Sequence, residues 1–180
     1  MDDWKLKYKH GMLLIWPPTK VRNLVNKLRS KYDPSSQKIC EAHITLTQPF
    51  LEKPNAFAWK IVNKTLREFP KFKIFFGPIE TFKSTSVIKF RIKPQKTLSK
   101  LRANLHKTGL FDLSLPFTKG FIAHMTISEF GINDPKKARE IAKDLNKKID
   151  EGSFICNNIS YIRPNKAFHF TIQKSLSFKK

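Results

Sequence analysis

The sequence has few cysteines, few acidic residues and no long apolar segment. Its 180 residues include two cysteines, Cys40 and Cys156, and their number and separation argue against a disulfide framework or a zinc site. The apolar run over residues 12–16 is short and ends in two prolines, so it fits neither a secretory signal nor a membrane span. We therefore expect a protein of the cytoplasm that does not act at a membrane.

The shortage of acidic residues gives the chain a strong positive charge. There are 35 Lys and Arg against 14 Asp and Glu, a formal net charge of +21, and the basic residues are spread along the chain. Such a protein attracts polyanions, with RNA or DNA favoured over a membrane surface. A generally lysine-rich composition is the alternative explanation, because charge alone does not establish RNA binding. The hydrophobic content of 40% and the 16 Phe indicate a folded globule.

Two short segments, residues 42–47 (AHITLT) and 123–128 (AHMTIS), repeat one pattern. Apolar and polar residues alternate in both, which predicts β-strands with one face buried and the other polar. The expected polar faces carry His43, Thr45 and Thr47 in the first strand and His124, Thr126 and Ser128 in the second. Cys40 falls on the apolar side of the first strand, so we expect a buried thiol rather than a Cys-His nucleophile pair.

Paired histidines and hydroxyls on two strands suit acid-base chemistry at a phosphate. One imidazole can remove a proton while another delivers one, and hydroxyl groups are suitable donors to phosphate oxygens. No cluster of Asp, Glu and His has metal-ligand spacing in the sequence, so we expect neither a metal ion nor another cofactor. The candidate catalytic residues are His43, Thr45, His124 and Thr126.

The order of expected elements repeats: strand, helix, His-containing strand, helix, strand. Strands are predicted over residues 11–16, 39–48, 71–82, 87–92, 123–128, 153–162 and 167–175, and helices over 19–32, after Pro54-Asn55, over 97–107 and after Asp134-Pro135. Gly77-Pro78 favours an edge or a bend for the strand that contains it. We predict an α+β fold in a single domain, residues 1–180, with lobes of about 1–84 and 85–180 facing across a cleft. Strands from one half of the sequence could also belong to the lobe of the other half, and the sequence leaves this alternative open.

The remaining histidines are weaker candidates, although four of the five histidines have Thr two positions later. His106 ends an amphipathic helix, where its neighbours are expected on the surface. His169 alternates with apolar residues and stays a reserve candidate, but it has no counterpart in the first half, and a solvated edge strand explains it equally well. His10 has no partner in the sequence.

Residues 43–50 (HITLTQPF) and 124–127 (HMTI) resemble the two signature motifs of the 2H phosphoesterase superfamily, and most nearly its 2′-5′ RNA ligase-like, or cyclic phosphodiesterase-like, branch. The likeness covers nearly the whole chain in element order. It implies a pseudo-twofold fold of two lobes, each an antiparallel sheet with helices, around a central cleft lined by the His-Thr strands. It also implies metal-independent hydrolysis of 2′,3′-cyclic phosphates at RNA ends, usually to a 2′-phosphate, and sometimes weak reversible 2′-5′ joining. The resemblance suggests His43 as the acid and His124 as the base.

Two positions depart from the pattern of this branch. Glu129 stands where arginine often follows the second motif, and Ala123 stands where proline often precedes it. The first departure leaves the phosphate without its usual cation. Lys119, just upstream of the second motif, is the candidate substrate-binding residue, although lysine is a poorer bidentate partner than arginine and a solvated loop lysine is the alternative.

The resemblance implies a metal-independent cyclic phosphodiesterase, and the pair of histidines favours an enzyme because binding alone would not need it. We expect a monomer. The alternatives are an RNA-terminus-binding module with little turnover, or a phosphodiesterase acting on 2′-5′ oligonucleotides or small cyclic nucleotides. An RNA end with a 2′,3′-cyclic phosphate and a small cyclic nucleotide both stay open as the partner.

Overall fold

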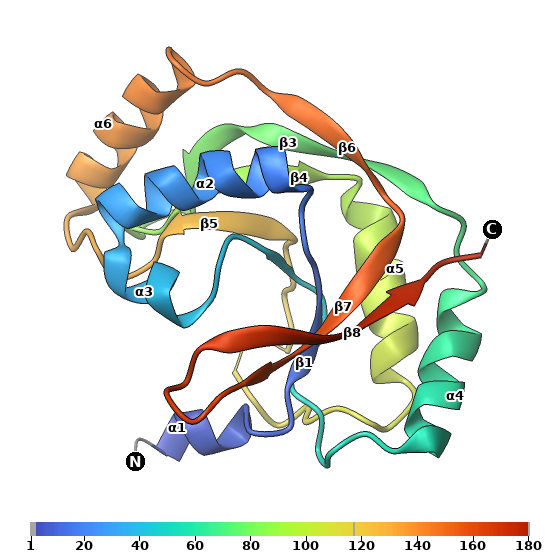
Figure 1. Cartoon of the computed structure of the whole chain (residues 1–180). Coiled ribbons are helices and arrows are strands. Elements are labelled where there is room, and N and C mark those ends of the chain that lie inside the picture. The colour runs from blue at the N-terminus through green and yellow to red at the C-terminus, as the bar shows by residue number, and fades with distance from the viewer. Residues whose placement is uncertain (1–2, 117, 180) are drawn as a thin grey trace.

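The computed structural model describes residues 3–116 and 118–179 and shows helices packed around two sheets (Figure 1). The helices are α1 (Asp3–Lys7), α2 (Thr19–Tyr32), α3 (Pro34–Ile39), α4 (Ala56–Leu66), α5 (Gln95–His106) and α6 (Pro135–Asn146). The strands are β1 (Met12–Ile15), β2 (Ile44–Thr45), β3 (Phe72–Thr81), β4 (Ile88–Lys93), β5 (His124–Ser128), β6 (Gly152–Cys156), β7 (Asn158–Pro164) and β8 (Phe170–Ser177). No helix in these residues is long and apolar enough to cross a membrane.

The strands form two antiparallel sheets, in the orders β2-β1-β7-β8 and β5-β4-β3-β6. The two segments 42–47 and 123–128, called the His-Thr segments below, contain the edge strands β2 and β5. The strand that pairs with each of them, β1 or β4, comes earlier in the chain, and helices lie between the two strands in sequence. These two edge strands, β2 and β5, lie next to each other, and α2 packs over β5 (Figure 1). The predicted α+β fold of two lobes with antiparallel sheets is confirmed.

The sheets do not divide the chain at residue 84, the expected boundary between the lobes. Strand β3 precedes that boundary but pairs with β4 and β6. Strands β7 and β8 come last in the chain but return to the sheet of β1 and β2. Each half of the chain therefore contributes strands to the sheet of the other half.

Residues 153–162 form two strands in different sheets, so the single strand expected there is wrong. Strand β6 pairs with β3, whereas β7 pairs with β1 and β8. The chain passes from one sheet to the other at Asn157, between the two strands. Apolar residues continue on both sides of this point, so their periodicity does not mark the crossing.

The first His-containing strand is much shorter than the predicted residues 39–48. Helix α3 ends at Ile39, the first residue of the predicted strand; Pro34 occupies its first turn and the Asp33 carboxylate accepts a hydrogen bond from the Ser36 backbone N–H at 3.2 Å. Both features favour a helix start. Strand β2 then pairs with β1 over Ile44 and Thr45.

Strand β3 lies between β4 and β6, so the expected edge position is wrong, although the expected bend is present. Its register with β4 shifts between Phe76 and Ile79, around Gly77-Pro78. Pairing with β6 covers residues 72–76. Beyond the bend, the Asn146 side chain of α6 bonds both the N–H and the carbonyl of Ile79, each at 2.7 Å. Proline is tolerated in this central strand because it lies at an irregularity where the ladder with β6 has ended.

One hydrophobic core extends through both sheets, and β1 is buried on both faces. Leu13 and Ile15 belong to the main core, while Met12 and Leu14 face a smaller cluster that includes Cys40. Burial on both faces explains why β1 reads as a continuous apolar run instead of an alternating one.

The third polar residue of each His-Thr segment is buried and holds the backbone, contrary to its expected place beside the histidine. Thr47 is fully buried and its hydroxyl accepts a hydrogen bond from the Leu13 backbone N–H at 3.0 Å. Ser128 is fully buried and donates to the Tyr32 carbonyl at 3.2 Å. Each segment therefore offers one histidine and one threonine for chemistry.

We predict that Thr47→Val lowers the free energy of unfolding by about 1–3 kcal/mol, because a buried N–H would lose its acceptor without a change in side-chain shape. Thr47→Ser, which keeps the hydroxyl, should lose less. Urea denaturation of both variants measures the difference, and a Thr47→Val protein as stable as the parent would contradict the assigned hydrogen bond.

Candidate active site

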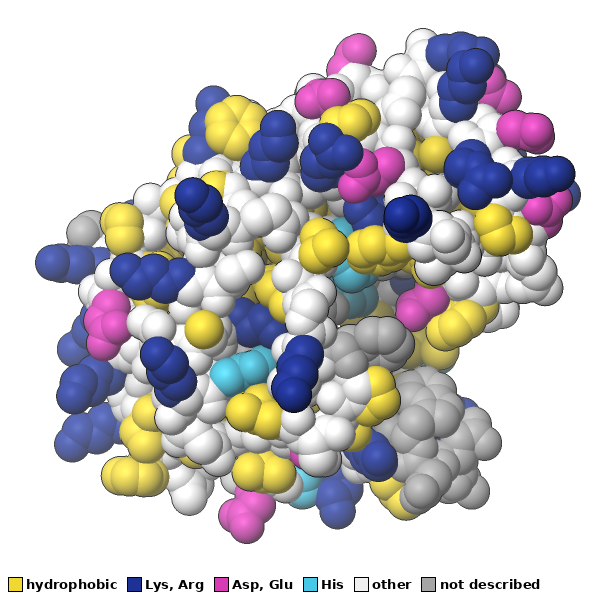
Figure 2. Space-filling view, turned by 180° about the vertical axis from the view of Figure 1, so that it is seen from behind, with side chains coloured by type: hydrophobic (Ala, Val, Ile, Leu, Met, Phe, Trp, Pro, Cys, Tyr) yellow, Lys and Arg dark blue, Asp and Glu magenta, His cyan; other side chains and the backbone are white. Residues whose placement is uncertain are grey.

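The adjacent strands β2 and β5 bring the two motif histidines near each other. Residues of β2 contact residues of β5, and the positive charge that His124 can carry lowers the pKa of His43. Both side chains are partly buried. Figure 2 shows histidine side chains in a hollow near the middle of one face, with lysine and arginine side chains around it.

The two imidazoles are held by equivalent hydrogen bonds. Nδ1 of His43 lies 2.6 Å from the Glu41 carbonyl oxygen, and Nδ1 of His124 lies 2.7 Å from the Ile122 carbonyl oxygen, in each case two residues earlier in the chain. A carbonyl oxygen can only accept, so Nδ1 carries the proton in both rings. In the neutral ring Nε2 then holds the lone pair, which is the form needed to take a proton from a substrate or water.

A threonine stands two residues after each histidine on the same face of its strand. Thr45 ends β2 and Thr126 lies in the middle of β5, and both side chains are partly buried. Strand geometry places each hydroxyl beside its histidine. The structure thus gives one imidazole and one hydroxyl from each of two neighbouring strands.

Arg29, which the sequence analysis missed, joins the two segments. It lies in α2 and is 4% exposed. Its Nη1 donates to the Thr126 carbonyl at 3.0 Å and its Nη2 to the Cys40 carbonyl at 3.1 Å. The available signal was its position four residues after the buried Val25, which places it on the inner face of the helix. An arginine on a buried helix face indicates a structural or functional contact.

Burial and neighbouring cations keep both histidines neutral in the free protein. Burial lowers the pKa of His43 to about 4, and the charges of Arg29 and His124 add to this effect, while the hydrogen bond to Glu41 opposes it. Burial also lowers the pKa of His124, and the nearby Lys89 lowers it further. A free protein at pH 7 therefore presents two neutral imidazoles.

Lys119, the predicted substrate-binding residue, lies exposed in the loop between α5 and β5. The cations whose charges act on the motif histidines are instead Arg29 and Lys89. Glu129 follows β5 with an exposed side chain, and its backbone N–H donates to the Asp33 carboxylate at 2.8 Å.

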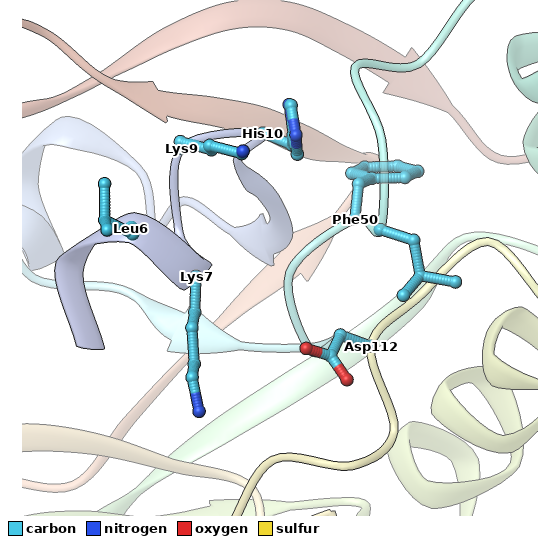
Figure 3. A pocket seen from close by; sticks show the side chains of 7 residues that line it. Leu6, Lys7, Lys9, His10, Phe50 and Asp112 are labelled. Carbon is cyan, nitrogen blue, oxygen red and sulfur yellow. The ribbon is translucent and has the colours of Figure 1, made fainter. Parts of the chain in front are cut away.

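The other histidines have different environments. His106 is buried while its neighbour Lys107 is exposed, and the His106 Nε2 accepts a hydrogen bond from the Gln48 backbone N–H at 3.1 Å. It supports the end of the first segment. His169 lies exposed in the turn between β7 and β8, where its N–H donates to the Asn165 side chain. His10 lines a cavity of about 240 Å³ with Phe50, Asp112 and residues of α1 (Figure 3). None of the residues lining this cavity belongs to the His-Thr pairs.

The cysteines do not offer a nucleophile. Cys40 and Cys156 are both buried, as expected for Cys40. Burial raises the pKa of each thiol to about 12, so both stay protonated at neutral pH. Among the residues that the structure describes, no group of three or more His, Cys, Asp and Glu side chains could hold a metal ion.

The chain is similar in sequence to a family of known proteins and to relatives named as phosphoesterases. Residues 17–167 match the family described as the 2′-5′ RNA ligase superfamily. A protein of Oceanobacillus iheyensis named as a candidate phosphoesterase is 30% identical over 124 residues, which cover 67% of this chain and 70% of the relative. A candidate phosphoesterase of Bacillus anthracis is 27% identical over 165 residues, covering 89% of this chain and 87% of the relative.

Solved structures share the fold at low sequence identity. The crystal structure of E. coli LigT with phosphate has a TM-score of 0.55 and 16% identity, covering 94% of this chain and 96% of that one. The protein TT0787 of Thermus thermophilus has a TM-score of 0.59 and 13% identity, covering 93% of this chain and 97% of that one.

We predict that Arg29→Gln raises the pKa of His43 above its value of about 4, because a cation that opposes protonation is removed. Burial, the larger cause, stays, so the rise is partial. Imidazole NMR titration measures it. Arg29→Lys keeps the charge and should keep the low pKa, and Lys27→Gln removes an exposed charge from the same helix as a control. An unchanged pKa in a folded Arg29→Gln protein would contradict the assigned role.

Proposed function

Since this chain belongs to the 2′-5′ RNA ligase superfamily, whose members are 2H phosphoesterases, we propose that it is a metal-independent phosphodiesterase that hydrolyses 2′,3′-cyclic phosphates at RNA ends to 2′-phosphates. The observation that supports this most is the matched pair of imidazoles, each with Nδ1 bonded to a carbonyl and Nε2 left as the reactive nitrogen. Binding a phosphate needs no such pair, whereas moving two protons does.

The proposed reaction uses one imidazole on each side of the phosphorus. A neutral histidine takes a proton from water through Nε2 as the water oxygen attacks phosphorus. The bond from phosphorus to the ribose 3′-oxygen breaks, and a protonated histidine gives its Nε2 proton to that oxygen. Thr45 and Thr126 donate hydrogen bonds to the non-bridging oxygens as negative charge builds there. We assign His43 as the acid and His124 as the base.

RNA is the proposed substrate because of the charge. The chain carries a formal charge of +21, and Figure 2 shows lysine and arginine side chains spread over the face that holds the hollow. These charges attract a polyanion more strongly than a mononucleotide. Exposed Lys119 would then contribute to the approach of RNA. Weak 2′-5′ joining of RNA ends would use the same groups in the same direction: the 5′-hydroxyl of a second RNA replaces water as the nucleophile, and the bond from phosphorus to the 3′-oxygen again breaks.

We predict that His43→Ala and His124→Ala each lower turnover of an RNA oligonucleotide ending in a 2′,3′-cyclic phosphate by about 10²-fold or more, with EDTA present. His169→Ala should retain nearly full activity, because His169 lies exposed in the turn between β7 and β8. Binding of the RNA without turnover by the parent protein would favour the alternative of an RNA-terminus-binding module.

The same variants separate the acid from the base. A phosphodiester with a nitrophenolate leaving group needs little protonation, so loss of the acid should matter less with this substrate than with the cyclic phosphate. We therefore expect the rate loss of His43→Ala to be smaller with the nitrophenolate substrate than with the cyclic phosphate, while the rate loss of His124→Ala stays similar with both. If the smaller loss is found for His124→Ala instead, His124 is the acid and His43 the base.

We predict that kcat/KM reaches its maximum below pH 6.5, the ordinary pKa of histidine, because burial lowers the pKa of both histidines while the reaction needs one of them protonated. The bound phosphodiester anion favours protonation, so the maximum of kcat should lie at higher pH than that of kcat/KM. Rate measurements from about pH 4 to 9 test both statements, with circular dichroism to confirm folding at each pH. A kcat/KM maximum above pH 7.5, about one unit beyond the ordinary value, would contradict them.

A further inference from the structure

We propose that Lys89 is the cation that binds the substrate phosphate beside His124 and Thr126. The proposal rests on the proposed function and names the residue that recognises the phosphate charge. Negative charge builds on the non-bridging oxygens in the proposed reaction, and a cation beside them would stabilise it. Lys89 lies in a strand that carries no motif, so the sequence pattern does not mark it as a site residue.

Lys89 stands in one row with the reactive part of β5. It is paired in register with Thr126 on one side and with Glu80 of β3 on the other. Residues directly opposite in an antiparallel pair share a face, with Cβ atoms about 4.5–5.5 Å apart. The Lys89 side chain therefore starts beside the Thr126 hydroxyl, on the face where His124 also lies.

The Lys89 ammonium is buried in a cluster that keeps a net positive charge. Its side chain is 3% exposed, and Nζ lies 2.5 Å from Oε1 of Glu80. Arg91 binds the other oxygen of the same carboxylate through Nε and Nη2. Two cations thus share one anion, so the group retains one positive charge. Arg91 alone could neutralise Glu80, and the burial of a second cation needs another reason.

Phe82 connects this charge to His124. The Phe82 and His124 rings are in edge contact, with centroids 5.0 Å apart, and Nζ of Lys89 lies 4.4 Å from the Phe82 centroid. A cation near an imidazole disfavours its protonation, and the charge of Lys89 does lower the pKa of His124. A phosphate anion bound beside Thr126, within reach of both groups, would reverse this effect by attracting both.

The other nearby charges fit this role less well. Arg29 directs Nη1 and Nη2 to backbone carbonyls inside the protein. Glu129 is an acid and would repel a phosphate. Glu80 uses one of the three donors of the Lys89 ammonium, so donors stay available for phosphate oxygens.

The test measures phosphate binding and turnover separately. In Lys89→Met, affinity for inorganic phosphate, followed by the imidazole NMR shifts of His124, should fall by about 10-fold or more, and the pKa of His124 should rise. Turnover of a 2′,3′-cyclic mononucleotide should fall by about 10²-fold. Lys93→Met, which removes an exposed charge from the same strand, is the matched control and should change each value less than about 3-fold.

Glu80→Gln distinguishes a binding role from a structural one. It breaks the ion pair but keeps both cations, so phosphate affinity should be unchanged or higher. The proposal would be overturned if Lys89→Met bound phosphate as tightly as the parent protein. It would also be overturned if Lys93→Met lost as much phosphate affinity as Lys89→Met. If the parent protein hydrolyses no cyclic phosphate but Lys89→Met still loses phosphate binding, the proposed reaction fails and the role of Lys89 stands.

Discussion

The site depends on the buried guanidinium of Arg29. The two His-Thr segments are edges of separate sheets, and no ladder joins β2 to β5 in the part of the chain that the structure describes. Arg29 donates to a carbonyl of β5 and to the carbonyl of Cys40, just before the first segment. Side-chain bonds from one helix therefore tie the two segments together across the shared core. Hydrogen bonds from a charged donor are among the stronger ones in a buried setting.

The charges around the two histidines in the free protein favour the binding of an anion. Burial is the main reason that each imidazole stays neutral, and the charges of Arg29 on His43 and of Lys89 on His124 add to it. An arriving phosphodiester supplies the negative charge that makes protonation of one imidazole favourable. The acid form is thereby produced mainly when substrate is present, and the two titrations belong to the pair rather than to single residues.

Local signals predicted much of this structure and long-range contacts explain the rest. Helix α2 has the predicted bounds, and the Asn55 and Asp134 side chains cap the helices that they were expected to start. The repeated His-Thr pattern identified both edge strands. The crossing at Asn157 and the roles of Arg29 and Lys89 depend on which segments pair across the fold, and periodicity within one segment carries no such information.

The order of strands has a consequence for how the protein is made. The second sheet, β3 to β6, is contiguous in the chain, so it can assemble while synthesis continues. The first sheet needs β7 to cover the free side of β1, and β7 follows every strand of the second sheet in the chain. Until β7 is made, the sheet that holds His43 is incomplete, so the sheet that holds His124 would form first.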